Sequence, residues 1–67
     1  MRYWFATFHC EFRGITRAPK LWSQCLMVHP VIELKRLNDA YSEKETHNLI
    51  FAMEITHEEF QQCKEAF

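Results

Sequence analysis

The sequence predicts a small α+β domain in which a three-stranded, mainly antiparallel sheet carries two helices, in the chain order β-β-α-β-α. Three observations support this prediction. Apolar residues alternate with period two near the start of the chain, they recur at spacings of three and four in the middle, and a helix-capping signal follows a third apolar segment. The 67 residues are enough for a single domain, residues 1–67.

The stretch RYWFATFHCEF, residues 2–12, predicts the first strand. Its odd-numbered positions begin aromatic and become polar, whereas its even-numbered positions are all apolar. This alternation is typical of a strand with one face in the core. The predicted core face consists of Trp4, Ala6, Phe8, Cys10 and Phe12. Gly14, the single glycine of the chain, is expected to end this strand.

The segment LWSQCLMVH, residues 21–29, fits either a second strand or a helix that starts after Pro19. We favour the strand, because a short loop back from the first strand forms a hairpin and the run CLMV suits a strand covered on both faces.

The segment HPVIELKRLNDAYSEK, residues 29–44, predicts an amphipathic helix, which ends at the polar run SEKETHN, residues 42–48. Pro30 suits the first helical turn, where its missing N–H costs nothing. The expected inward stripe is Val31, Leu34, Leu37 and Tyr41. The expected wet side is Glu33, Lys35, Arg36, Asn38 and Asp39.

Residues 48–56, NLIFAMEIT, return to strand character. Leu49, Phe51, Met53 and Ile55 would share one face. Since both faces are largely apolar, we expect this strand to be buried in the sheet. Residues 56–67 then predict a short helix, because Thr56 and Glu59 have the spacing of a capping box.

With a hairpin followed by a right-handed crossover, the predicted sheet order is 2-1-3, with the first strand antiparallel to both neighbours. Three strands and two helices suffice for a two-layer domain. If both helices cover one face, the other face of the sheet has no partner within the chain.

The cysteines favour a reduced protein. Cys10, Cys25 and Cys63 are odd in number and widely spaced, so no disulfide framework is expected. No segment reads as a signal peptide, and none approaches the length of an apolar membrane span. These features predict a cytoplasmic location.

No residue pair predicts catalysis, a metal or a cofactor. His9 and Cys10 are adjacent on a strand and therefore face opposite sides of the sheet. Cys25 and His29 have ligand spacing on a helix, but on the favoured strand they lie roughly 13 Å apart. The sequence therefore predicts a protein that is not an enzyme, with no metal, no cofactor and no small-molecule substrate.

The predicted function is protein–protein association, as a homodimer or as an accessory module, through an uncovered sheet face or an edge strand. The expected interaction surface is Tyr3, Phe5, Thr7 and His9, with Arg13, Arg17 and Lys20 as its electrostatic edge. The alternative is single-stranded nucleic-acid binding, with Tyr3 and Phe5 stacking on bases and the basic loop contacting phosphates. The net charge of -1 weighs against the alternative.

Overall fold

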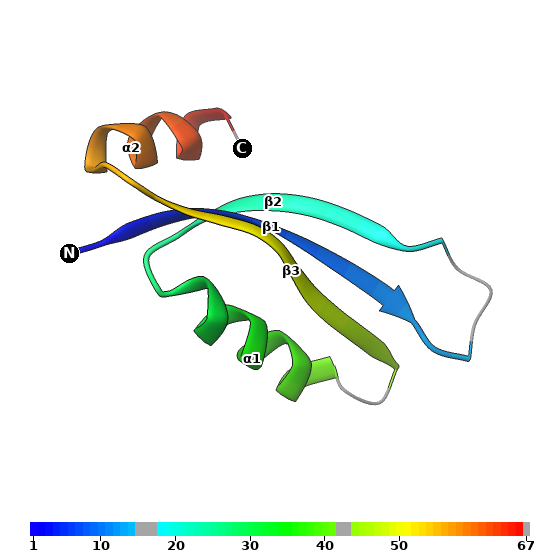
Figure 1. Cartoon of the computed structure of the whole chain (residues 1–67). Coiled ribbons are helices and arrows are strands. Elements are labelled where there is room, and N and C mark those ends of the chain that lie inside the picture. The colour runs from blue at the N-terminus through cyan, green and yellow to red at the C-terminus, as the bar shows by residue number, and fades with distance from the viewer. Residues whose placement is uncertain (15–17, 42–43, 67) are drawn as a thin grey trace.

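The computed structural model describes residues 1–14, 18–41 and 44–66 (Figure 1). Five elements follow one another along the chain: β1 (Tyr3–Phe12), β2 (Lys20–Leu26), α1 (Pro30–Tyr41), β3 (Glu45–Ile55) and α2 (His57–Ala66). This order confirms the predicted β-β-α-β-α topology. The ambiguous second segment is a strand.

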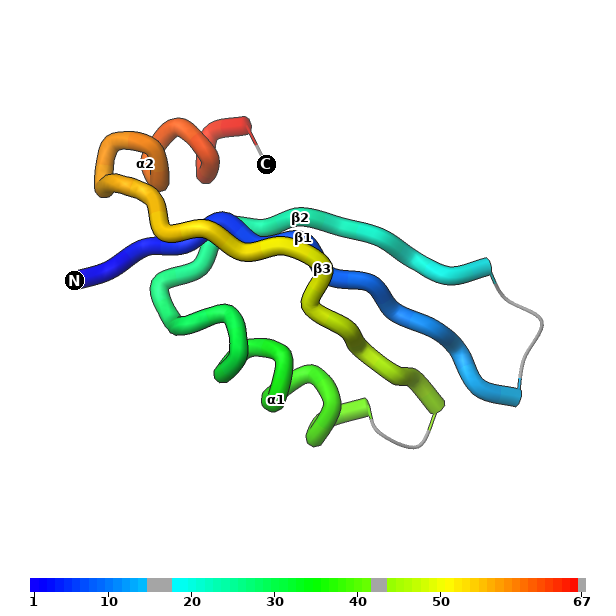
Figure 2. Tube along the Cα trace, viewed as in Figure 1, coloured from blue at the N-terminus to red at the C-terminus, as the bar shows by residue number. Residues whose placement is uncertain are grey.

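The sheet has the strand order β2-β1-β3, as predicted. β1 lies in the centre and is antiparallel to both neighbours, so β2 and β3 run parallel to each other on either side of it (Figure 2). Gly14 follows β1 with a φ of 69°, a left-handed conformation that only glycine adopts at little cost. The single glycine therefore lies where the chain turns out of the central strand.

The two helices lie on opposite faces of the sheet (Figure 1). α1 packs on one face, where Leu37 joins Ala6 and Phe8 in the core. α2 lies over one end of the other face, where the ring of Phe60 packs 4.6 Å from that of Tyr3. Neither face is therefore left wholly uncovered. Among the described helices, none combines the length and apolar character needed to cross a membrane.

The core lies between the sheet and α1, on the face formed by the even-numbered residues of β1. Ala6 and Phe8 are completely buried, and Leu26 and Leu37 complete the cluster. The partly buried residues packed against it are Trp4, Trp22, Leu34 and Leu49. This arrangement confirms the core face predicted from the alternation in residues 2–12.

α1 presents a different stripe from the predicted one. Leu37 is buried, but Val31 and Tyr41 are exposed. Glu33, expected on the wet side, is only 8% exposed. Its carboxylate accepts two hydrogen bonds from the guanidinium of Arg36, at 2.8 and 2.6 Å. Because these bonds replace those to water, the helix can turn a charged residue towards the sheet.

The prediction that the third strand is buried is wrong, since β3 forms an edge of the sheet. Thr7 pairs with Phe51 but Phe8 pairs with Leu49, which leaves Ile50 as an extra residue in β3. This bulge reverses the side-chain alternation along β3. Leu49 therefore packs on the core beside α1, whereas Phe51 lies on the opposite face. The prediction that these two residues share a face is wrong.

The expectation of no disulfide is also wrong. Cys25 of β2 and Cys63 of α2 form a disulfide, with their Cα atoms 6.3 Å apart. Cys25 pairs with Phe5 across the hairpin, so both residues face the side on which α2 docks. The two cysteines are 38 residues apart in the sequence. Their pairing could not be predicted, because it depends on which face of the sheet the last helix covers.

Candidate functional site

Part of the predicted interaction surface lies under α2. The ring of Tyr3 is 4.6 Å from that of Phe60 and 5.3 Å from that of His57. Phe5 lines a hollow of about 380 Å³ at α2, together with Cys63. Both rings of β1 that were candidates for stacking are thus engaged within the chain.

Thr7 and His9 lie further along β1, on the same face as Tyr3 and Phe5. The hydroxyl groups of Thr7 and Ser23 share a hydrogen bond of 2.8 Å across β1 and β2. His9 is half-buried and pairs with Leu21 and Asn48. This part of the face is more polar than the end that α2 covers.

The basic residues of the predicted surface do not lie together in the structure. The Nε of Arg13 donates a hydrogen bond of 2.8 Å to the hydroxyl of Thr46. Lys20 pairs with Cys10, so it lies on the core side of the sheet, with its Nζ 5.9 Å from the centre of the Trp22 ring. Arg17 lies outside the described residues. Lys20 is therefore on the opposite side of the sheet from Tyr3, Phe5, Thr7 and His9.

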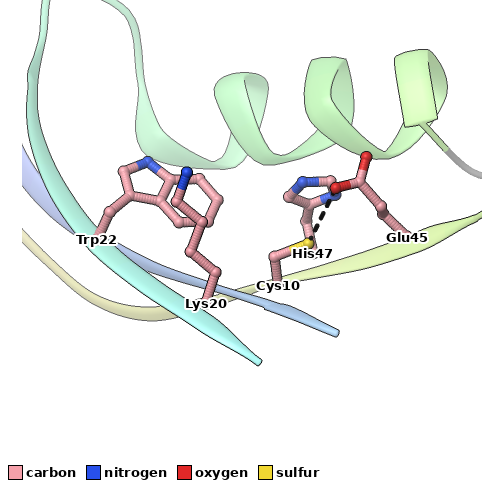
Figure 3. Close-up of a pocket in the computed structure, with 5 residues that line it drawn as sticks. All are labelled: Cys10, Lys20, Trp22, Glu45 and His47. Carbon is pink, nitrogen blue, oxygen red and sulfur yellow. Dashed lines mark hydrogen bonds between the residues drawn. The ribbon is translucent and has the colours of Figure 1, made fainter. Parts of the chain in front are cut away.

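Three side chains that could bind a metal ion lie close together at the other end of the sheet. Cys10, Glu45 and His47 each offer one donor atom, and these three atoms lie within 4.8 Å of one another. The Cys10 thiol donates a hydrogen bond of 3.4 Å to Oε1 of Glu45 (Figure 3). We refer to these three residues as the Cys-Glu-His cluster.

The strand register builds this cluster. Cys10 lies directly opposite His47, and Glu45 precedes His47 by two residues on the same face of β3. Asn38 of α1 fixes this part of β3, because it accepts the N–H of His47 at 2.9 Å and donates to its carbonyl at 3.2 Å. The N–H of His47 thus points away from β1, so Cys10 and His47 form a non-hydrogen-bonded pair, the type in which facing side chains approach most closely.

The cluster is largely shielded from solvent and borders a hollow of about 270 Å³, which Lys20 and Trp22 also line (Figure 3). Cys10 is 2% exposed and His47 is 5% exposed. Nδ1 of His47 is buried and has no hydrogen-bond partner among the groups that the structure describes. A buried imidazole nitrogen without a partner is unusual in a folded protein.

Sequence reasoning missed this cluster for a specific reason. The sequence pattern predicts that the third strand begins at Asn48, which leaves Glu45 and His47 in the polar run before it. The strand begins at Glu45 instead. The available signal was the pattern Glu-x-His just before an apolar strand, since two residues at this spacing share a face once the strand is extended.

The second notable feature is the outer edge of β3, residues 48–53, which we call the β3 edge. Ile50, Phe51 and Met53 are 59%, 49% and 45% exposed. The stretch contains no charged residue. It ends at Glu54, whose carboxylate accepts hydrogen bonds of 2.8 and 3.0 Å from Arg2, which lower the pKa of Glu54.

Comparison with protein-family models, with curated proteins and with solved structures finds no match to this chain. The case for a function therefore rests on the Cys-Glu-His cluster and on the β3 edge.

Proposed function

We propose that this protein is a non-enzymatic association module that forms a homodimer by pairing the β3 edges of two chains. The observation that carries this proposal is the uncharged, apolar β3 edge. Sheet edges of monomeric proteins are usually protected by charges, prolines or covering segments. Among the described strands, β3 pairs with β1 alone, and residues 48–53 carry none of these protective side chains.

The chemistry of the β3 edge suits a second copy of the same chain. Two copies of one strand pair antiparallel about a two-fold axis, so each residue meets its mirror position. If the two-fold axis passes through Phe51, Glu54 lies opposite Asn48 of the partner subunit. The remaining pairs join residues 49–53 of the two chains, all of which are uncharged. No like charges oppose each other in this register. Pairing would also enlarge the small hydrophobic core of a 67-residue chain.

The bulge and Asn38 limit where this pairing takes place. Asn38 already occupies the backbone N–H and carbonyl of His47, so the strand is closed at that residue. Beyond the bulge, the exposed side chains of Phe51 and Met53 are on the strand segment that remains open. We therefore place the dimer contact on residues 48–53 and not along all of β3.

Analytical ultracentrifugation of the full chain over a range of concentrations tests this proposal. The wild type should sediment as a dimer at high micromolar concentration, and Ile50→Lys should sediment as a monomer, because a charge at this edge position opposes pairing. Ile32→Lys is the matched control, since Ile32 is equally exposed but lies on α1. A wild type that stays monomeric, or a dimer that survives Ile50→Lys, would overturn the proposal.

Nucleic-acid binding remains the second hypothesis, but Tyr3 and Phe5 now need α2 to move before they can stack on a base. Fluorescence anisotropy with a mixed-sequence single-stranded oligonucleotide at low salt tests it, because phosphate contacts are strongest there. Binding that Tyr3→Ala weakens would support this second hypothesis.

A cytoplasmic location is likewise a proposal, and it requires that Cys25 and Cys63 be reduced in the cell. Disulfides are rare in the cytoplasm and persist in oxidising compartments. The Cys25–Cys63 bond therefore favours an oxidising compartment over the cytoplasm. Thiol trapping in intact cells tests the cytoplasmic location: reduced Cys25 and Cys63 would support it, and oxidised ones would count against it.

A further inference from the structure

We propose that Cys10, Glu45 and His47 form a zinc-binding site. The proposal concerns the opposite end of β3 from the apolar residues of the dimer contact, and it does not depend on dimer formation. It rests on the donor set, on the unpartnered nitrogen of His47 and on the hollow beside the cluster.

The geometry of the cluster is close to that of a metal site. In tetrahedral zinc sites, bond lengths of 2.0–2.3 Å place neighbouring donor atoms about 3.5 Å apart. The three donor atoms lie within 4.8 Å of one another, and the Cys10 sulfur is already 3.4 Å from Glu45 Oε1. The remaining difference is small enough for side-chain rotation to close it.

The backbone and the ring of His47 are both held in place. Asn38 fixes its backbone with two hydrogen bonds, and the rings of Trp22 and Tyr41 pack against the imidazole at 6.0 and 5.9 Å. Nδ1 is nevertheless buried without a partner among the described groups. A bound cation would account for this unpartnered nitrogen. The ion could bind the imidazole directly, or the nitrogen could contact another ligand of the ion.

The charge balance and the softness of the donors favour zinc. A thiolate and a carboxylate together cancel the two positive charges of the ion, so the loaded site is neutral, which suits a largely buried position. Sulfur and imidazole ligands select zinc over calcium and magnesium, which prefer sets made only of oxygen. The hollow of about 270 Å³ leaves room for a fourth ligand, such as water, beside Lys20.

Thiol catalysis is the competing use of the same residues. A nucleophilic cysteine must meet its substrate, but Cys10 is 2% exposed and lies at the base of the cluster. A metal ion needs only a narrow path to such a position. Burial of the sulfur therefore favours metal binding over catalysis.

The test uses the full chain with its disulfide intact, after treatment with a chelator. A thiol assay in denaturant should first detect one thiol per chain, because two of the three cysteines are bonded to each other. Titration with cobalt(II), which reports tetrahedral zinc sites by its colour, should then give one ion per chain and a thiolate-to-cobalt charge-transfer band. Added zinc should displace the cobalt and abolish both signals.

Variants assign the ligands. Cys10→Ser should remove the charge-transfer band, and His47→Gln and Glu45→Gln should each weaken zinc binding at least tenfold in calorimetric titration. His9→Gln is the matched control, since His9 adjoins Cys10 on β1 but faces the other side of the sheet. Circular dichroism in chelator should show that each variant folds. Absence of the band in the wild type, or its persistence in Cys10→Ser, would overturn the proposal.

Discussion

The two helices cover opposite faces of one small sheet, but they are held there in different ways. α1 has twelve residues and buries three of them, Pro30, Glu33 and Leu37. α2 has ten residues and buries only Phe60. A helix of ten residues is marginal on its own in water. The comparison indicates that α1 is held by packing, whereas α2 needs the covalent bond between Cys63 and Cys25.

Removing the disulfide should break this comparison most strongly. For a sequence separation of 38 residues, loop-closure entropy gives about 3–4 kcal/mol of stabilisation. Urea unfolding of the double variant Cys25→Ser/Cys63→Ser should show a loss of this size, and α2 should become largely unfolded, because one buried side chain is too little to dock it.

Reduction of the wild type is the internal control. It should lower the free energy of unfolding by the same amount, and the double variant should not respond to the reductant. Equal stability of the oxidised wild type and the double variant would show that packing alone holds α2, as it holds α1.

The sequence predicted α1 and α2 equally well as helices, but it did not predict how they dock. Periodicity located α1, and the capping box located α2: Thr56 N–H donates to Glu59 at 2.9 Å, and Glu59 N–H donates to Thr56 at 3.1 Å. These are contacts between residues three positions apart, so they are visible in the sequence. The faces that the helices cover depend on tertiary contacts, so they are not.

The same division between local and distant contacts explains the results for the sheet and the site. The alternation in β1 correctly predicted Phe8 and Cys10 as core residues. The bulge at Ile50 could not be predicted, since no glycine or proline marks it, and it changes which residues of β3 share a face. The Cys-Glu-His cluster was missed because its members come together only when the register of β1 and β3 is known.

Asn38→Ala should loosen the α1 side by a smaller amount. The variant loses both hydrogen bonds that join α1 to the backbone of His47, and each such bond contributes about 0.5–1.5 kcal/mol. We therefore expect a loss of about 1–3 kcal/mol in chemical unfolding, together with faster hydrogen exchange at the His47 amide. Asp39→Ala is the control, because Asp39 is exposed and, among the described residues, is bonded to Lys35 of the same helix. If the two variants behaved alike, Asn38 would not be the link between α1 and β3.

The smallest effect should come from the pH dependence of Glu33, the charged residue that α1 turns towards the sheet. Hydrogen bonds from Arg36 lower the pKa of Glu33 below its usual value, and a weaker one from Gln24 acts in the same direction. Since this pKa is lower in the folded state than in the unfolded chain, the stabilisation is fully present above the unfolded value of about 4.3. It is lost as the pH falls through the folded pKa. Glu33→Gln should therefore be less stable than the wild type at neutral pH, and the difference should shrink in acid.

Glu58→Gln gives the baseline for this measurement, because Glu58 also lies in the first turn of a helix, α2, but is exposed. Unfolding of the two variants and the wild type should be followed at neutral pH and near pH 3. The effect should be modest, since Arg36 is largely exposed and water screens its charge. A difference that does not change with pH would mean that Glu33 supports α1 through its shape and hydrogen bonds alone. In that case, the charge of Glu33 would not contribute to holding α1 on the sheet, and α1 would differ from α2 in its packing alone.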